Sequence, residues 1–310
     1  MKSNPEISVL MSVYNGKKYL QKSIESILNQ TFSNFEFIII NDASIDNSLE
    51  IIKSFSDSRI VILNNSENLG LTKSLNIGLK QASGKYIARL DADDLSFENR
   101  LEKQLSFIKK NNLSLIGSSA ILIDELGNEI GKKIKPENPT EIKFHLLLKN
   151  PFLHSSLFFK KEDIEKIGYY DEKFIFAQDY DLVSRLSHSG FNLGNISKPL
   201  IKYRIQKNSI TENKDYRKEQ LKNALRTSLA NCLLYIHLNE KNISSLIKGV
   251  NGKKTGFFET ISNLINFSLL KSSFLKKEKI SEKDYRLIKK IYLSEQKTIL
   301  ASFLKNHFSL

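Results

Sequence analysis

Short apolar runs and helical stretches alternate along the first third of this 310-residue chain. Each apolar run has the length of a buried strand, and the stretches between the runs repeat apolar residues at helical spacing, as Leu20, Ile24 and Ile27 do. The strand-like runs are Ile7–Val13, Phe35–Ile40, Ile60–Leu63 and Tyr86–Leu90. Continuous apolar strands separated by helices are typical of a parallel sheet that is covered on both faces. The sequence therefore predicts an α/β fold with a mostly parallel central sheet flanked by helices.

Polar residues stand where these strands end. Asn15 follows the first strand, Asp42 the second and Asp91 the fourth. The carboxyl ends of parallel strands meet at one edge of the sheet, and ligands of such sheets bind there. We therefore expect these three side chains to converge on one binding rim.

A cluster of carboxylates, Asp91, Asp93 and Asp94, directly follows the fourth strand. Like charges this close repel one another unless a cation, hydrogen bonds or open solvent relieves them. Two hard oxygen ligands at this spacing suit Mn²⁺ or Mg²⁺, which keep open positions for substrate phosphates. The cluster taken alone fits a metal site and a solvated acidic loop equally well.

Length and charge divide the chain in two. Residues 1–200 contain 25 Lys and Arg and 25 Asp and Glu, whereas residues 201–310 contain 22 basic and 9 acidic residues. The second part therefore carries the whole formal net charge of +13. We expect a catalytic domain over residues 1–212 and a basic helical region over residues 213–310.

Cysteine content and hydropathy bear on the compartment. Cys232 is the one cysteine of the chain, which excludes an internal disulfide, and its apolar neighbours Leu229, Leu233 and Ile236 favour a packing role. The N-terminus shows no signal-like apolar core, and no run approaches the roughly 18 apolar residues that span a bilayer. We therefore expect a cytoplasmic protein.

Several segments, spread over about 200 residues, form a series of recognisable motifs. They are Ile7–Asn15, Ser26–Thr31, Ile40–Asp46, Asn68–Gly70, Ala88–Asp94 and Ala177–Leu182. In order and spacing they resemble glycosyltransferase family 2, and the resemblance does not cover the tail beyond about Asn213. The resemblance implies a nucleotide-diphospho-sugar-binding α/β fold, a divalent cation, and inverting transfer of one sugar to an acceptor.

The resemblance also implies roles on the donor side. Asp93 is expected as the main ligand to a Mn²⁺ or Mg²⁺ ion on the diphosphate, with Asp91 reaching the metal or the ribose and Asp94 supporting them. Asp42 is expected to accept the uracil N–H, and Tyr14 to lie against the base, on which an aromatic ring stacks readily. The alternatives are turn or cap bonds for Asp42 and simple wall packing for Tyr14.

A second acidic motif provides the candidate general base. By resemblance, Asp179 deprotonates the acceptor, and Gln178 stands where relatives often have Glu. A neutral neighbour removes one like charge, so Asp179 should ionise more easily than it does in relatives. The alternative is that Asp179 caps the following helix, and we expect Asp181 to have only such a structural role.

Several cationic groups and one further histidine complete the candidate site. Arg89 and Arg100 flank the acidic cluster and are expected either to bind phosphate or to pair with the neighbouring carboxylates. Arg204 resembles the family arginine that closes over the diphosphate, whereas Gln206 replaces the histidine that often follows it. His154 begins a segment that faces the acceptor in the family, and core packing is its alternative role.

The basic tail suggests a surface function. Apolar residues recur at helical spacing over 215–238, and the segment 257–274 is richer in them. A group of lysines lies at the end of that segment: Lys271, Lys276, Lys277 and Lys279. This pattern suits an anionic membrane surface, and the alternatives are a helical cap and a homodimer contact. Nucleic acid is not an expected partner, because no recognition motif accompanies the charge.

The sequence thus predicts a metal-dependent inverting glycosyltransferase that uses a UDP-sugar or another nucleotide-diphospho-sugar. Its expected acceptor is a glycan or lipid-linked glycan of a bacterial capsule or lipopolysaccharide, and its expected place is the cytoplasm or the inner face of the cytoplasmic membrane. A sugar-1-phosphate nucleotidyltransferase is one alternative, but Tyr14–Lys18 lacks the glycine- and arginine-rich loop usual there. A non-catalytic nucleotide-sugar-binding module is the other, and it would not need Asp179. A dehydrogenase is excluded because no Gly-x-Gly-x-x-Gly follows a strand.

Overall fold

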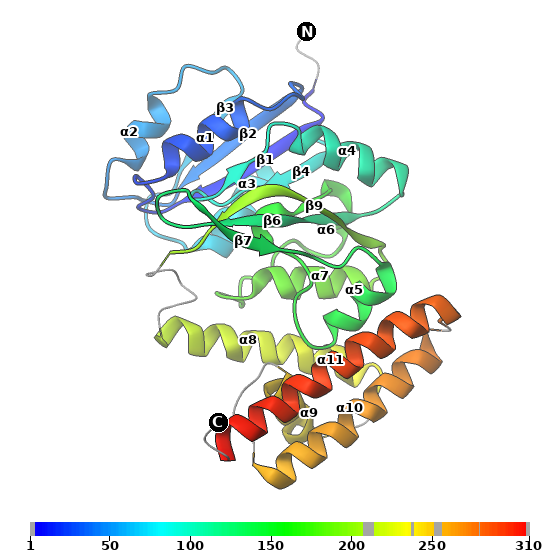
Figure 1. The fold of residues 1–310 in the computed structure, drawn as a ribbon. Coiled ribbons are helices and arrows are strands. Elements are labelled where there is room, and N and C mark those ends of the chain that lie inside the picture. Colours follow the sequence, from blue (N-terminus) through cyan, green and yellow to red (C-terminus); the bar gives the residue numbers. More distant parts are fainter. Residues whose placement is uncertain (1–3, 207–213, 237–238, 251–255, 279, 308–310) are drawn as a thin grey trace. The chain divides into compact units, whose positions relative to one another are not determined.

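The computed structural model describes residues 4–206, 214–236, 239–250, 256–278 and 280–307, and the chain divides into two compact units (Figure 1). The first unit contains residues 1–137 and 152–220, and the second contains residues 138–151 and 221–310. This division differs from the single boundary expected at residue 212. Segment 138–151 packs with the C-terminal helices because its apolar side chains Phe144, Leu147 and Leu148 belong to their core.

The first unit is built on a sheet of nine strands within the described residues, in the order β3-β2-β1-β4-β8-β6-β9-β5, with β7 paired to β6. Four strands are parallel: β1 (Ile7–Val13) lies between β2 (Phe35–Asn41) and β4 (Tyr86–Arg89), and β3 (Ile60–Asn64) flanks β2. Both faces of β1 are buried, since Val9 and Met11 pack in one core while Leu10 points to the opposite face. The predicted strands are therefore the observed ones, within a residue or two at their ends.

The other half of the sheet is mixed. Strand β8 (Phe158–Lys160) is antiparallel to both β4 and β6 (Leu115–Ile123), and β9 (Leu193–Arg204) runs parallel to β6. The short strands β5 (Leu95–Ser96) and β7 (Glu129–Lys133) add antiparallel pairs to β9 and β6. The predicted α/β fold class is confirmed, and four neighbouring strands, β3-β2-β1-β4, are parallel throughout.

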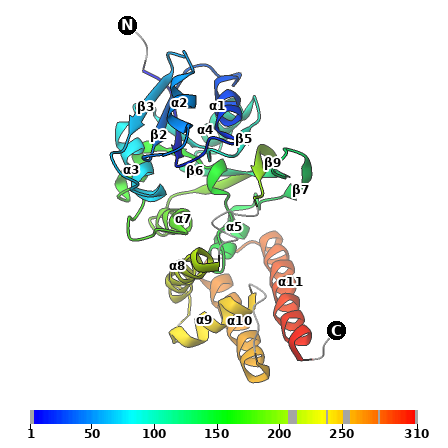
Figure 2. The same ribbon diagram turned by 90° about the vertical axis from the view of Figure 1, so that its left-hand side faces the viewer.

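Helices cover both faces of this sheet (Figure 2). Helices α1 (Leu20–Leu28), α2 (Ser48–Lys53) and α4 (Arg100–Lys110) contribute to the core on the face of Val9. Helix α3 (Leu71–Gln81) packs on the other face through Gly78, where an added Cβ would lie 2.8 Å from a methyl group of Ile40. The 3₁₀ turn His154–Ser156, α6 (Lys161–Lys166) and α7 (Gln178–His188) complete the unit.

The second unit is helical. It contains α5 (Pro139–Leu146), most of α8 (Lys214–Leu233), α9 (Glu240–Val250), α10 (Phe257–Lys277) and α11 (Glu282–His307). Phe144 packs against Phe267 and Phe274, with ring centroids 6.1 and 5.1 Å away. Burial raises the pKa of the Cys232 thiol to about 12, in agreement with the predicted packing role. Within the described ranges, every helix is too short or too polar to cross a bilayer.

Candidate active site

The acidic cluster forms the turn that follows β4. The backbone N–H of Asp94 donates to the carbonyl of Asp91 (3.2 Å), and the N–H of Asp91 donates to the hydroxyl of Ser155 (3.0 Å). The carboxylate of Asp91 forms an ion pair with Arg89, a residue that is only 1% exposed. Nε and Nη2 of Arg89 have no hydrogen-bond partner among the described residues. Arg89 therefore contributes mainly a buried positive charge next to the cluster.

The two remaining carboxylates of the cluster repel each other in a poorly solvated place. Burial, followed by the charge of Asp91, raises the pKa of Asp93 to about 6. Burial, with the charges of Asp93 and Asp91, also raises the pKa of Asp94 well above its ordinary value. Gln206 Nε2 donates to Asp93 Oδ2, and the backbone N–H of Arg204 donates to Asp94 Oδ1 (2.8 Å). Burial sets this cluster apart from a solvated acidic loop, and a bound cation would relieve the remaining repulsion.

Arg204 and Arg100 donate hydrogen bonds to backbone carbonyls around the cluster. Nε of Arg204 donates to the carbonyl of Asp93 (2.8 Å), and its guanidinium carbon lies 4.2 Å from the ring centroid of Tyr19. Nη2 of Arg100 donates to the carbonyl of Arg89 (2.6 Å). These contacts give both arginines structural roles, and contact of Arg204 with the diphosphate stays a prediction.

The loops after β1 and β2 are tied together at the predicted rim. Asn15 has a left-handed backbone with φ 53°, and its Oδ1 accepts the N–H of Ile45 (2.9 Å). The N–H of Lys17 donates to Asp46 Oδ2 (3.1 Å). Tyr14, in the same loop, is 51% exposed, so its ring is accessible to a base. Asn15 therefore orders the rim, while stacking by Tyr14 stays a prediction.

Asp42 is almost fully buried and holds the turn that leads into α3. Its Oδ1 accepts bonds from Asn65 Nδ2 (2.7 Å) and the N–H of Leu69 (2.9 Å), and its Oδ2 accepts the N–H of Gly70 (2.9 Å). Gly70 has φ 81°, which only glycine adopts readily, and α3 begins at the next residue. The turn role accounts for these bonds, and contact with uracil stays a prediction.

Asp179 lies in the first turn of α7, just after Ala177, whose φ of 57° turns the chain sharply into the helix. Burial raises the pKa of Asp179, and backbone N–H groups, Arg89 and Lys135 partly offset that rise. Arg89 is therefore within electrostatic reach of both the acidic cluster and Asp179. Asp179 and the acidic cluster, which are far apart in the sequence, are therefore both influenced by the charge of one buried guanidinium.

His154 has a buried partner. Its Nε2 lies 3.0 Å from the hydroxyl of Tyr170. Burial and the charge of Arg89 keep the pKa of His154 well below its ordinary value, so the ring is neutral at neutral pH. This geometry fits the packing alternative, and acceptor contact by His154 stays a prediction.

Two residues of α3 were missed by the sequence analysis. Nδ2 of Asn76 donates to the carbonyl of Tyr170 (2.9 Å), and its Oδ1 accepts the N–H of the same residue (3.1 Å). The hydroxyl of Thr72 donates to the carbonyl of Phe174 (2.8 Å). Both side chains thus hold the segment that leads to Asp179. The available signal was a pair of polar residues four positions apart on the apolar face of a helix.

Two carboxylates of the acidic cluster could hold a metal ion. In the part of the chain that the structure describes, no three His, Cys, Asp or Glu side chains come together as an ion site on their own. Asp91 and Asp93 offer two oxygen donors, and Mg²⁺ or Mn²⁺ bound this way takes its other ligands from water and phosphates. The donor set therefore fits a divalent cation that is completed by a diphosphate.

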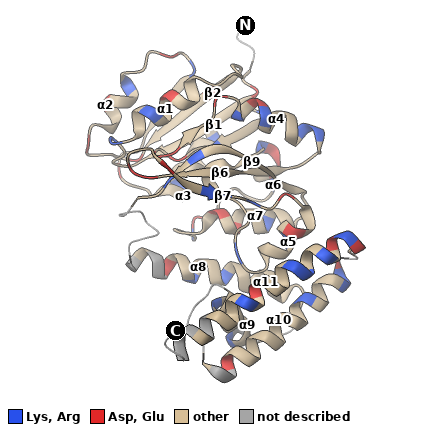
Figure 3. Cartoon of the chain, viewed as in Figure 1, with Lys and Arg blue, Asp and Glu red and all other residues tan. Residues whose placement is uncertain are grey.

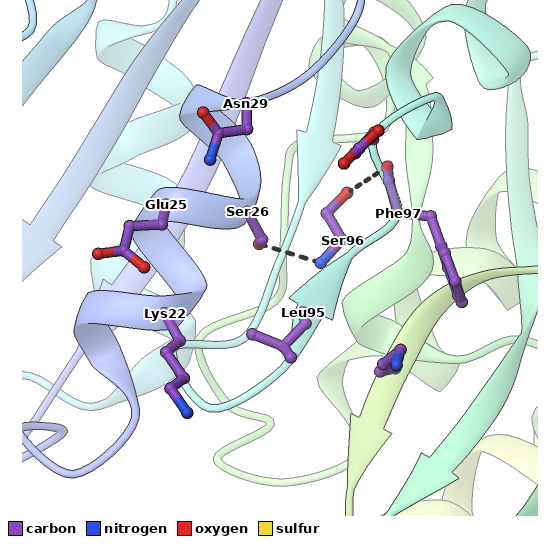
Figure 4. A pocket seen from close by; sticks show the side chains of 9 residues that line it. Lys22, Glu25, Ser26, Asn29, Leu95, Ser96 and Phe97 are labelled. Carbon is purple, nitrogen blue, oxygen red and sulfur yellow. Dashed lines mark hydrogen bonds between the residues drawn. The ribbon is translucent and has the colours of Figure 1, made fainter. Parts of the chain in front are cut away.

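A cavity of about 250 Å³ lies beside the acidic turn, between α1 and β5 (Figure 4). Lys22 and Glu25 of α1 line it together with Leu95 and Ser96 of β5. The N–H of Ser96 donates to the hydroxyl of Ser26 across it (3.0 Å). The predicted site residues are not among its lining, so the cavity is a neighbour of the candidate site and no part of it.

Comparison with known proteins identifies the family. The model of glycosyl transferase family 2 matches residues 8–168. An uncharacterized glycosyltransferase of Methanocaldococcus jannaschii is 42% identical over 208 residues, which cover 65% of this chain and 71% of that protein. The O-antigen biosynthesis glycosyltransferase WbnJ of Escherichia coli is 38% identical over 211 residues, which cover 66% of this chain and 81% of that protein. WfgD of the same species, a UDP-Glc:α-D-GlcNAc-diphosphoundecaprenol β-1,3-glucosyltransferase, is 33% identical over 67% of this chain and 80% of its own length.

Solved structures agree on the fold. Staphylococcus aureus TarS in complex with UDP superimposes with a TM-score of 0.61 at 15% identity, covering 98% of this chain and 92% of that chain. Its complex with UDP-GlcNAc also gives 0.61 and covers 97% and 91%. The resemblance seen in the sequence is confirmed, and the chain is a glycosyltransferase that belongs to glycosyltransferase family 2.

Proposed function

We propose that this enzyme is a metal-dependent inverting glycosyltransferase that moves a sugar from a UDP-sugar to a lipid-linked glycan of a bacterial cell-surface polysaccharide. Capsule and lipopolysaccharide synthesis are the processes that we expect it to serve. The observation that carries the proposal is the buried guanidinium of Arg89, which lies in contact with Asp91 and within electrostatic range of Asp179. This guanidinium forms an ion pair with Asp91, and its positive charge lowers the pKa of Asp179.

Inverting transfer needs two groups on opposite sides of the sugar carbon. One group takes the proton of the attacking hydroxyl, and the other neutralises the diphosphate that leaves. Asp179 is the proposed proton acceptor. Asp93 and Asp91 are the proposed ligands of a Mn²⁺ or Mg²⁺ ion, which when bound supplies positive charge to the leaving diphosphate. Without the ion, the repelling carboxylates would disfavour an anionic donor.

The protein environment suits Asp179 to its proposed role. Burial raises its pKa, which makes the carboxylate a stronger base, and backbone N–H groups, Arg89 and Lys135 limit the rise. Asn76 and Thr72 hold the segment before α7, and so keep the carboxylate at a constant position.

The donor and acceptor are proposed from the relatives. TarS structures were solved with UDP and UDP-GlcNAc, and the name of WfgD gives a UDP-sugar donor and a diphosphoundecaprenol-linked acceptor. A similar acceptor would place this enzyme at the inner face of the cytoplasmic membrane.

A transfer assay tests the proposal. The enzyme is incubated with Mn²⁺, an acceptor that carries GlcNAc-diphosphate on a short lipid, and each of several UDP-sugars in turn. We expect one donor to release UDP in step with formation of a glycosylated lipid of inverted anomeric configuration. Release of UDP without any glycosylated product, with every donor and acceptor tested, would contradict the proposed acceptor class.

A further inference from the structure

Helix α10 presents an apolar stripe to solvent. Ile261, Ile265 and Leu269 follow one another at four-residue intervals, so they share one side of the helix, and each is between 42% and 56% exposed. The opposite side, with Phe267, Leu270 and Phe274, is buried in the core of the second unit. The stripe therefore remains outside a core that is already complete.

Helix α11 presents a face that is both basic and apolar. Leu293, Leu300 and Leu304 are 43% to 47% exposed and lie on one side of the helix. Lys289, Lys290 and Lys297 are exposed around them, and none of the three pairs with an acid among the described residues. Figure 3 shows Lys and Arg repeated along α11, whereas much of α10 is uncharged.

Two acidic residues of these helices are paired with basic side chains, and two others accept hydrogen bonds from neutral groups. Glu295 pairs with Lys149 (2.5 Å), and Glu282 pairs with Arg286 (2.6 Å). Glu259 accepts the hydroxyl of Ser245 (2.7 Å), and Asp284 accepts the side-chain amide of Asn138 (2.8 Å). The three lysines of α11 thus dominate the charge of its outer side.

Two of the lysines that the sequence assigned to a membrane surface make contacts within the second unit. Lys277 donates to the carbonyl of Leu234 (2.8 Å), and Lys271 lies 4.2 Å from the ring centroid of Tyr292. Lys276 is exposed at the end of α10, and Lys279 lies outside the described residues. Lys289, Lys290 and Lys297 of α11 are exposed as well, and they extend the predicted basic region beyond the end of α10.

We propose that helix α11, together with the apolar stripe of α10, forms a docking surface for an anionic lipid bilayer, with Leu293, Leu300 and Leu304 entering the interface beside Lys289, Lys290 and Lys297. Apolar side chains at helical spacing next to lysines are the pattern of helices that lie in the plane of a membrane. A second copy of the chain is the less suitable occupant, because a symmetric contact would bring like charges of α11 together. The inference deepens the proposed membrane location and does not depend on turnover.

Co-sedimentation with vesicles tests this surface. The full chain is mixed at low salt with vesicles of phosphatidylcholine containing a third phosphatidylglycerol, and with vesicles of phosphatidylcholine alone. We expect retention by the anionic vesicles, release as salt rises, and little retention by the neutral ones. Absence of retention at low salt, or equal retention by both kinds of vesicle, would overturn the proposal.

Matched variants assign the binding to the two helices. Changing Lys289, Lys290 and Lys297 together to Gln should lower the vesicle partition coefficient on the order of a hundredfold, since three lysines near the surface are lost. The control removes the same charge from the first unit, at Lys53, Lys103 and Lys110, and should change partition little. Changing Ile261, Ile265 and Leu269 to Ser should weaken retention at every salt concentration.

UDP binding and transfer to a soluble acceptor separate this inference from the proposed function. UDP binding, measured by thermal shift, should be equal in the lysine variant and the parent protein, which would show that the fold and the donor site are intact. If the lysine variant and its control partition alike, the surface is wrong even when transfer to a soluble acceptor proceeds. If vesicles retain the protein but no sugar is transferred, the proposed function fails and the surface stands.

Discussion

The side-chain amide of Asn76 bonds both backbone polar groups of Tyr170, 94 residues further along the chain. Asn76 Oδ1 accepts the N–H of Tyr170, and Nδ2 donates to its carbonyl, as a neighbouring strand would do. Helix α3 starts at the turn held by Asp42, so one helix joins the rim at which we propose the donor to bind to the segment before Asp179.

This relationship predicts the effect of Asn76→Ala. The variant leaves two buried backbone groups of Tyr170 without partners, which should lower the free energy of unfolding by about 1–3 kcal/mol. We expect transfer to fall at least tenfold while the affinity for UDP stays near that of the parent. The exposed Lys73→Ala on the same helix is the control, and it should change neither quantity. Parental transfer by a stably folded Asn76→Ala protein would show that α3 does not position the base.

Asp42→Asn separates the two roles considered for Asp42. An amide keeps the size of the side chain but turns one acceptor oxygen into a donor, facing N–H groups of the turn. We expect a clear loss of thermal stability from the turn alone. A parallel loss of UDP affinity, measured by calorimetry below the melting temperature, is expected if Asp42 also binds uracil. Unchanged affinity would leave Asp42 with the turn role only.

The pH dependence of transfer should report Asp179. The base acts only when ionised, and burial raises its pKa, so the rate should fall on acidification at a higher pH than for an ordinary aspartate. Arg89 lowers this pKa, and therefore Arg89→Met should move the acid limb to still higher pH. Arg89→Lys keeps the charge and should leave the limb nearly in place. An acid limb that is identical in all three proteins would mean that Arg89 does not act on the base.

The sequence predicted the local features of this molecule and missed most contacts between distant segments. Apolar strands and acidic turns are formed by consecutive residues. The sequence could therefore predict the strand Ile7–Val13 and the turn after Tyr86–Arg89. The burial of Arg89 was not predictable, since it depends on which side chains of other strands and helices surround β4. Thr72 and Asn76 were missed for the same reason, because their partners lie about 100 residues away.

Domain organisation shows the same limit. The charge changes near residue 200 and the predicted boundary was residue 212, whereas 138–151 joins the C-terminal helices through Phe144 and its neighbours. Composition averages over long windows and therefore cannot reveal a short segment whose apolar residues fill another unit's core.

The central claim is that the acidic cluster binds the donor while Asp179 activates the acceptor, and two variants measured side by side test it most directly. UDP affinity in Mn²⁺ and in excess EDTA is determined by calorimetry for the parent, Asp93→Asn and Asp179→Asn, and transfer is measured on the same preparations. We predict that EDTA and Asp93→Asn each weaken UDP binding and abolish transfer. Asp179→Asn should bind UDP as the parent does but transfer sugar two to four orders of magnitude more slowly, the usual worth of a general base. Full transfer in EDTA, or parental transfer by Asp179→Asn, would contradict the account.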